Sequence, residues 1–251
     1  MFFKRYGTIW VGESVLLNQF SWLQHGITTR KGGTSQPPFF SMNIASNVQD
    51  DPKSVQENRL RLFDAIGCQE TSICEANQVH GNSVLTASES GQYIDADGFI
   101  TDQSSLVLTI RTADCVPVFI IDRKKHVIGL VHAGWRGTVA RIAKMAVEDM
   151  IMEFGSQPEN IFAWIGPSIG PCCYEVGGEV KQTVEGRYVE DSKLNLWLYN
   201  SDQLRQIGVL EKHIEIAGVC TCCHEEWFYS HRASGGKTGR MLSFLQIKKG
   251  L

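Results

Sequence analysis

Three short runs of apolar residues near the middle of the chain predict buried β-strands. The runs cover residues 106–110, 116–121 and 127–131, are rich in β-branched side chains and are separated by short turns. Cys115 lies just before the second run and His132 just after the third. We therefore expect a thiol and an imidazole to meet at one edge of a sheet, and we expect the chemistry of the protein there.

Two longer segments have the hydrophobic spacing of amphipathic helices. In the first, residues 50–67, an Asp-Asp-Pro sequence places acidic side chains and a proline in the first turn, and Gly67 ends the helix. In the second, we expect Thr138 to cap the helix N-terminus and Gly155 to end the helix.

Shorter patterns predict the remaining elements. Apolar segments bounded by glycine, proline or polar residues indicate strands at residues 20–30, 73–79, 84–87, 161–165, 214–219 and 240–247. Further helices are expected over residues 178–185 and 201–207, and a turn over residues 93–101. The loop at residues 166–176 contains two glycines and two prolines, so it is stiffer than a mere spacer.

Length and composition favour one globular domain. A chain of 251 residues can bury a single large core, and 43% hydrophobic with 20% charged residues is ordinary for a soluble protein. A formal net charge of -3 gives no electrostatic basis for binding nucleic acid or an anionic membrane. The first residues lack the apolar run of a signal peptide and no later stretch is long enough to span a bilayer, so we expect a cytoplasmic protein.

The eight cysteines do not indicate a disulfide framework, because the chain is long and shows no secretory signal. Cys172-Cys173 and Cys222-Cys223 are adjacent pairs, which are poorly placed to bridge each other. The sequence from Cys220 to His224 lacks two paired Cys-x-x-Cys motifs, which favours packing or surface thiols over a structural zinc site.

His80, Cys115 and His132 form the strongest candidate site. Each is ordinary when taken alone, but each follows or ends an apolar strand and stands beside small or turn residues. Two imidazoles and one thiolate are the ligand set of a catalytic zinc that keeps a fourth position open. The same residues also fit a cysteine hydrolase with Cys115 as nucleophile and a histidine as base. The presence of two histidines with one thiol favours the ligand role.

Arg136 is the first candidate for binding an anion. It stands in a glycine-flanked segment at a helix N-terminus, where free backbone N–H groups and the helix dipole attract phosphate. A structural arginine stacked on Trp135 is an equally good interpretation. Arg30, beside Gly32-Gly33, is a weaker candidate, Arg232 is weaker still, and Asp97 is a spare carboxylate near the central strands.

Motifs spread in order over nearly the whole chain resemble a bacterial family first labelled polyphenol oxidase or laccase domain. This family is now described as purine nucleoside phosphorylase with adenosine deaminase activity, and it includes the peptidoglycan editing factor. The matching segments are Thr29-Arg30-x-Gly-Gly-x-Ser35, Ser41-x-Asn43, Asn77-Gln-Val-His-Gly81, Asp97-Gly98-x-x-Thr101, Ala113-Asp-Cys-x-Pro117, His132-Ala-Gly-Trp-Arg-Gly137, Gly166-Pro-x-Ile-Gly-Pro-Cys-Cys-Tyr-Glu-Val176, and Phe228-Tyr-Ser-His-Arg232 with Thr238-Gly-Arg240.

The resemblance implies an α+β fold, with one domain over residues 1–251 in which mixed β-sheets pack with flanking helices. It also implies that His80, Cys115 and His132 hold Zn²⁺. Copper is a less favoured alternative, because a multicopper oxidase needs closely paired histidines and this chain has seven histidines with no His-x-His pair.

The activity that the resemblance implies is phosphorolysis of adenosine, inosine or guanosine to the free base and ribose 1-phosphate, with deamination of adenosine as a second activity. In deamination, water activated by the metal would attack the purine C6 while Asp97 carries the proton. In phosphorolysis, Arg136 would hold phosphate, and Arg30 and Asn43 would hold phosphate or the sugar. The expected partners are therefore small molecules, and the oligomeric state is left open.

Two other classes of function remain open from the sequence. A hydrolase would depend on Cys115 as nucleophile, and a binding protein or editing enzyme would act on a peptidoglycan precursor. The first predicts that Cys115→Ser abolishes turnover without loss of metal, and a non-catalytic role predicts ligand binding without turnover.

Overall fold

The computed structural model describes residues 1–248 and shows a single domain built around two mixed β-sheets. The first sheet has the strand order β1-β2-β3-β15-β8-β4-β6. Its strands are β1 (Phe2–Tyr6), β2 (Ile9–Glu13), β3 (Leu23–Thr28), β15 (Met241–Ile247), β8 (Val107–Thr112), β4 (Ile73–Ala76) and β6 (Gly91–Tyr93). The pairs β8–β4 and β4–β6 are parallel, and the other neighbours are antiparallel.

The second sheet has the order β14-β11-β9-β10-β7-β5. Its strands are β14 (Ile214–Ile216), β11 (Ile161–Ile165), β9 (Val116–Asp122), β10 (Val127–Ala133), β7 (Gly98–Thr101) and β5 (Val84–Thr86). The outer pairs are parallel and the inner pairs antiparallel. A small ribbon joins β12 (Val189–Glu190) to β13 (Lys193–Leu194).

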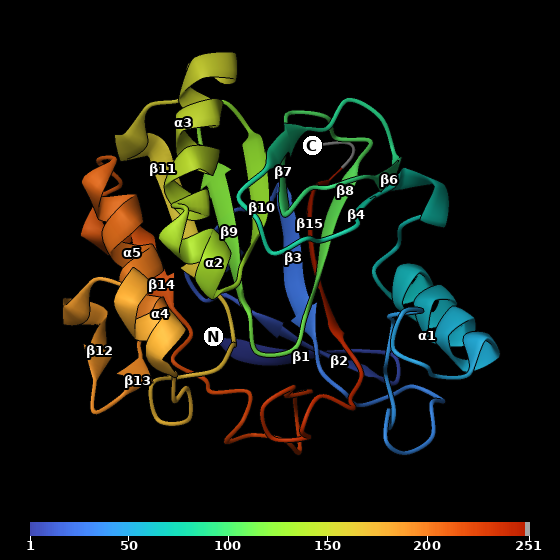
Figure 1. The fold of residues 1–251 in the computed structure, drawn as a ribbon. Coiled ribbons are helices and arrows are strands. Elements are labelled where there is room, and N and C mark those ends of the chain that lie inside the picture. Colours follow the sequence, from blue (N-terminus) through green and yellow to red (C-terminus); the bar gives the residue numbers. More distant parts are fainter. Residues whose placement is uncertain (249–251) are drawn as a thin grey trace.

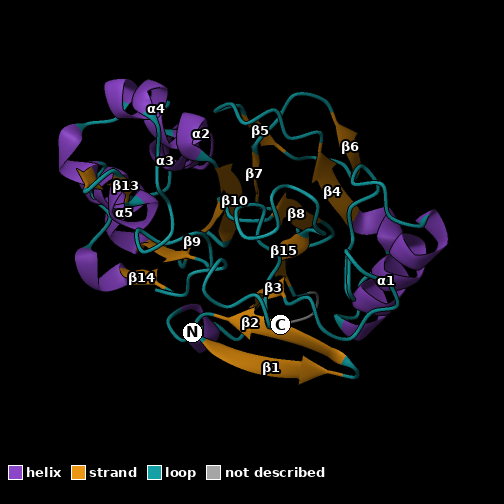
Figure 2. Ribbon diagram, turned by 60° about the horizontal axis from the view of Figure 1, so that its bottom comes forward, coloured by secondary structure: helices purple, strands orange, loops and turns teal. Residues whose placement is uncertain are grey.

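The helices lie on the outer sides of the two sheets. They are α1 (Pro52–Ala65), α2 (Trp135–Val139), α3 (Ile142–Phe154), α4 (Gly178–Thr183) and α5 (Leu196–Gln206). Figure 1 shows α1 on one side of the molecule and α2 to α5 on the opposite side, and Figure 2 shows the same separation from another direction. Among residues 1–248, every helix is too short or too polar to cross a lipid bilayer.

Successive side chains of the central strands point to opposite faces of the sheet, and both faces are buried, which explains why these strands are apolar throughout. In β9, Phe119 and Ile121 belong to the core cluster between the sheets, whereas Val118 and Ile120 belong to the cluster that packs under α3 and α5. Because both faces are covered, the strand carries no polar face. A third cluster packs α1 against the outer face of the first sheet, with Leu62 and Phe63 beside Phe244. The predicted α+β fold of mixed sheets with flanking helices is confirmed.

The ends of the elements differ from the predictions at several places. Strands that were expected over residues 20–30, 73–79 and 214–219 are shorter, covering 23–28, 73–76 and 214–216. The predicted turn at residues 93–101 is wrong in part, because it contains the end of β6 and all of β7. The helix expected over residues 201–207 begins earlier, at Leu196, where Asn195 caps it by accepting from the Leu198 amide. The helix expected over residues 178–185 ends at Thr183.

The helix expected to begin at Thr138 starts earlier and is divided in two. Gly134 is the N-cap of α2, and the left-handed backbone of Arg141 (φ 64°) separates α2 from α3. The Thr138 hydroxyl accepts a hydrogen bond from Asn200 on α5 at 3.0 Å, so it joins two helices instead of capping one. Gly155 ends α3 as predicted, in a left-handed conformation that glycine adopts without strain.

Candidate metal centre and cavity

His80, Cys115 and His132 meet at one end of the space between the two sheets. One donor atom from each lies within 4.8 Å of the others, and the two imidazole rings are 4.8 Å apart in an edge-to-face arrangement. Strand alternation places His132 there, because it is on the same face of β10 as Ile128 and Leu130, which pack between the sheets. His80 follows β4 of the first sheet, and Cys115 lies in the link from β8 to β9, so the site joins both sheets.

Asp97 holds two of the three residues in place. This fully buried carboxylate contacts Nδ1 of His132 at 2.8 Å through Oδ1. It also accepts hydrogen bonds from the amides of Val79, His80 and Gly81. These bonds support the left-handed backbone of His80 (φ 60°), which is uncommon for a residue other than glycine. Because Asp97 accepts from Nδ1–H, Nε2 of His132 is left as the nitrogen for a ligand.

The charges of the site favour an ion pair in the metal-free protein. Burial alone would disfavour the thiolate of Cys115, but the His132 imidazolium and hydrogen bonds from His132 and His80 lower the pKa of Cys115 to about 6. Burial likewise opposes the charge of His132, but the Cys115 thiolate and the Asp97 carboxylate raise its pKa to about 9. The pKa of Asp97 is lowered despite its burial, because His132 and the backbone amides bind the carboxylate.

The donor set and the space around it fit a metal ion. A thiolate, an imidazole oriented by a carboxylate and a second, solvent-exposed imidazole are the ligands of an open zinc site. Gly134 leaves room for them: a β-carbon at this position would lie 3.3 Å from Sγ of Cys115 and 3.3 Å from the His80 ring. The glycine is therefore required by the close approach of the donors and not by its own backbone angles, since its φ is -67°.

Asp114 fixes the link that carries Cys115. Its backbone is left-handed (φ 86°), and its carboxylate accepts hydrogen bonds from the hydroxyl of Thr221 and the amide of Arg232, each at 2.7 Å. The carbonyl of Asp114 accepts from the Ile169 amide at 2.9 Å. Three distant segments thus hold a strained residue beside the thiol.

The three donors lie in the wall of a cavity of about 470 Å³. Four arginines also line it, together with apolar and aromatic side chains. The arginines are Arg111, Arg136, Arg232 and Arg240, and the apolar or aromatic side chains include Trp135, Tyr174, Ile169 and Leu196. A volume of this size and a lining that combines cationic and aromatic groups suit a small organic anion, or a small organic molecule together with an inorganic anion.

Arg136 lies in this cavity wall, in the first turn of α2. Its guanidinium stacks over Trp135 at 4.2 Å and contacts Glu179 at 3.2 Å, and the side chain is exposed. The two interpretations of this arginine, stacked on Trp135 or facing an anion, are therefore compatible within one geometry.

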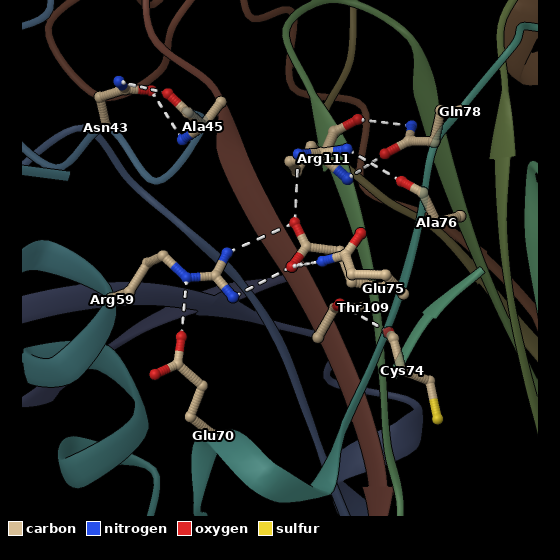
Figure 3. Close-up of polar contacts among 11 residues, drawn as sticks. Asn43, Ala45, Arg59, Glu70, Cys74, Glu75, Ala76, Gln78, Thr109 and Arg111 are labelled. Atoms are coloured by element: carbon tan, nitrogen blue, oxygen red, sulfur yellow. Dashed lines mark hydrogen bonds and ion pairs between the residues drawn. The ribbon is translucent and has the colours of Figure 1, made fainter. Parts of the chain in front are cut away.

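Arg111 and Arg240, for which the sequence patterns predicted no role, also face the cavity. Figure 3 shows how Arg111 is held: Glu75 contacts Arg111 at 3.1 Å and Arg59 of α1 at 3.0 Å. The Arg111 guanidinium also donates to the Ala76 carbonyl. Arg59 is also paired with Glu70 at 3.2 Å, so the two arginines and two carboxylates of this network balance in charge, and buried Glu75 holds Arg111 in the cavity wall.

The other predicted contact residues do not line the cavity. Arg30 donates to the carbonyls of Phe40 and Glu225 and stacks on Tyr229. Asn43 is fully buried and accepts from the amide of Arg240, so it positions a cavity residue from behind. Asp97 also lies behind the cavity wall, where it contacts His132 instead of a ligand.

Comparison with known proteins identifies relatives over most of the chain. The family described as multi-copper polyphenol oxidoreductase laccase matches residues 24–248. A protein named purine nucleoside phosphorylase YlmD, from Bacillus subtilis, is 36% identical over 89% of this chain and 88% of its own. The Escherichia coli purine nucleoside phosphorylase YfiH is 35% identical over 88% and 92%.

Solved structures agree with these sequence matches. The crystal structure of Bacillus licheniformis hypothetical protein YfiH has a TM-score of 0.89 and 32% identity, covering 98% of this chain and 99% of that one. YlmD from Geobacillus stearothermophilus matches with the same TM-score and coverage at 31% identity.

The ion pair at Cys115 gives a test in solution. In metal-free protein, the thiolate of Cys115 should persist as the pH falls until about pH 6. In His132→Asn the thiolate should form only above about pH 9, because burial is then no longer opposed by an imidazolium. The measurement is the ultraviolet absorbance of the thiolate as a function of pH. For the native protein and for His132→Asn, the absorbance of the same protein carrying Cys115→Ser is subtracted, so that only the Cys115 signal remains. Equal midpoints in the two chains would contradict the ion pair.

The same shifts set the sign of the pH dependence of stability. The lowered pKa of Cys115 contributes stability above its unfolded value of 9.0, and this contribution is lost as the pH falls through about 6. The raised pKa of His132 contributes stability below its unfolded value of 6.5, and this is lost as the pH rises through about 9.

Gly134 offers a test of the metal centre with a matched control. Gly134→Ala should weaken metal affinity by about tenfold or more, because the added methyl group presses on two donor residues. Gly177 is also a helix N-cap glycine with extended backbone, but a β-carbon there would contact nothing within 4 Å. Gly177→Ala should leave the affinity unchanged in the same competition titration with a chromophoric chelator. Equal affinities for the two variants would contradict the proposed position of the metal.

Proposed function

The chain belongs to the family described as multi-copper polyphenol oxidoreductase laccase, and from this premise we propose that it is a zinc-dependent purine nucleoside phosphorylase that also deaminates adenosine. Its relatives from Bacillus subtilis and Escherichia coli are named purine nucleoside phosphorylases. The observation that carries the proposal is the presence of an open two-histidine, one-thiolate donor set and four arginines in a single cavity.

Zinc is proposed because of the donors. Two imidazoles and one thiolate fit a four-coordinate zinc with one position for a ligand. A multicopper oxidase needs closely paired histidines, and the seven histidines of this chain include no His-x-His pair. When bound, the ion would supply Lewis acidity toward an oxygen of phosphate or water.

The residues of the chain account for substrate binding in the proposed phosphorolysis. Arg136, Arg111 and Arg240 carry the charge that holds phosphate, and Trp135 and Tyr174 offer aromatic faces to a purine base. Phosphate attacks C1′ of the ribose, the glycosidic bond breaks, and the base leaves with the proton that phosphate gives up. Fixing phosphate and nucleoside in one cavity lowers the barrier by orienting the two reactants.

In the proposed deamination, Asp97 acts through His132. The carboxylate sets the tautomer of the imidazole and balances its charge, and it is too deeply buried to meet the purine. The proposed role of Asp97 is therefore that of a positioning residue. The same is proposed for Asn43, which holds the backbone of Arg240. Arg30 supports the loop at residues 39–41 instead of the substrate.

A second candidate, a cysteine hydrolase, is favoured by one specific observation. Cys115, His132 and Asp97 form a line of thiolate, imidazole and carboxylate, which is the arrangement of a nucleophile, its base and the group that orients the base. An editing enzyme that acts on a cell-wall precursor stays a prediction from the family resemblance.

The proposed function is tested by incubating the purified holoprotein with inosine and phosphate, and separately with adenosine, and identifying the products. We expect hypoxanthine with ribose 1-phosphate in the first case and inosine in the second. His80→Ala and Cys115→Ser should lose both the metal and turnover, whereas Cys68→Ser, at a thiol that packs against the third core cluster and lies outside the cavity, should lose neither. Loss of turnover in Cys115→Ser with the metal retained would favour the hydrolase, and full phosphorolysis by a metal-free variant would overturn the proposal.

Arg136 is tested against an arginine in similar surroundings. Arg187 stacks over Tyr188 at 4.7 Å and contacts Glu185 at 3.0 Å, as Arg136 does with Trp135 and Glu179, but it lies outside the cavity. Arg136→Ala should raise KM for phosphate by about tenfold, since a charge-assisted hydrogen bond contributes about 1.5 kcal/mol or more. Arg187→Ala should leave KM unchanged. The same KM for both variants would exclude Arg136 from phosphate binding.

A further inference from the structure

A second group of thiols lies outside the candidate metal centre. It consists of Cys172, Cys173, Cys220 and Cys223, whose sulfur atoms all lie within 4.8 Å of one another. Sγ of Cys223 is 3.5 Å from Sγ of Cys172 and 3.4 Å from Sγ of Cys173. All four are free cysteines. The sequence patterns did not indicate this grouping, because Cys172-Cys173 and the segment from Cys220 to His224 were considered separately, and packing or surface thiols were favoured for the second of these.

The distances match a metal site with four sulfur ligands. A tetrahedral zinc with bonds of about 2.3 Å to sulfur has sulfur–sulfur edges of about 3.8 Å. The donors also come from two separate loops, as structural zinc sites commonly require. One loop follows β11 and the other follows β14, and these two strands are parallel neighbours, so both loops leave the sheet at the same edge.

The surroundings of the four sulfurs are those of ligands and not of core residues. Cys172 and Cys223 are exposed, and only Cys220 is buried. Sγ of Cys220 accepts a hydrogen bond from the Gly170 amide at 3.2 Å, an interaction that favours a thiolate. Gly170 also meets a steric need, because a β-carbon there would lie 2.6 Å from Trp197 and 3.3 Å from Sγ of Cys172. The loop is therefore shaped to bring its backbone amide and both its thiols to one point.

We propose that Cys172, Cys173, Cys220 and Cys223 bind a second zinc ion, in a closed structural site that fastens the loop after β11 to the loop after β14. Four thiolates leave no position for substrate, which distinguishes this site from the open centre at Cys115.

The site supports the cavity wall. Tyr174 directly follows the two adjacent cysteines and lines the cavity. Arg232, from the other loop, donates to the carbonyls of Cys173 and Glu175 at 3.0 and 2.9 Å, and its guanidinium lies 5.3 Å from the centre of the Tyr174 ring. In Figure 1 the second loop, in orange-red between β14 and β15, runs along the bottom of the view, below the link from β8 to β9, which it holds through the hydrogen bonds of Thr221 and Arg232 to Asp114. The second zinc thus fixes the segments that carry two cavity residues.

The test is metal analysis of the holoprotein, purified under reducing conditions from zinc-supplemented cells. The native chain should contain about two equivalents of zinc, and Cys115→Ser should retain about one, held by the four thiols. Cys220→Ser and Cys223→Ser should lose one equivalent, and Cys68→Ser should lose none. Because Cys115→Ser leaves the second site intact, the proposal remains testable even if the variants at Cys220 and Cys223 fail to fold.

Cobalt substitution identifies the ligands. In the Cys115→Ser chain, Co²⁺ should give the strong visible and near-ultraviolet absorption of a tetrathiolate site, and an alkylating reagent should label Cys172 and Cys223 only after a chelator is added. A metal-free Cys115→Ser chain, iron in place of zinc, or a disulfide among the four cysteines would each overturn the proposal, whereas a single zinc that both the native chain and the Cys115→Ser chain retain would support it. These outcomes do not depend on the nucleoside activity, so the two proposals fail separately.

Discussion

The contact between Asp97 and His132 is the interaction on which the candidate site depends most. One buried carboxylate binds an imidazole from β10 and three consecutive amides from the loop after β4, so it connects the two sheets at the point where their donors meet. Without it, the left-handed backbone of His80 would lose its support and His132 would lose its fixed tautomer. The carboxylate is fully buried, and its charge is balanced locally by the groups that it positions.

Other acidic side chains hold residues around the three donors in place in the same way. Asp114 holds the link that carries Cys115 by binding two groups from the loop between β14 and β15. Glu75 holds Arg111 and reaches Arg59 on α1. Buried acidic groups thus organise a cavity whose charged lining residues are mostly arginines, so a slightly acidic chain can still attract an anion at this place.

The sequence predicted the central part of the fold well, because the strands at residues 116–121 and 127–131 are covered on both faces and therefore apolar throughout. It also grouped the three donors that the structure brings together, since each ends or follows such a strand.

The sequence patterns missed β7, which is only four residues long. They assigned Thr138 to a helix cap because sequence spacing does not show that Asn200 of a distant helix donates a hydrogen bond to its hydroxyl. Arg111 was missed because an arginine in a strand looks like any polar position, and its direction depends on pairing with β15. The four clustered thiols were missed because their two loops are adjacent only through the parallel pairing of β11 and β14.

The position of β15 in the first sheet affects how the protein folds during synthesis. This strand is the last of residues 1–248 to be made, yet it lies between β3 and β8 and pairs with both. The hairpin of β1 and β2 with β3 therefore has no hydrogen-bonded connection to the β8 half of its sheet until translation has passed residue 247. The candidate donors His80, Cys115 and His132 are all synthesised before β15. The order of the strands along the chain therefore places the synthesis of these donors before the completion of the first sheet.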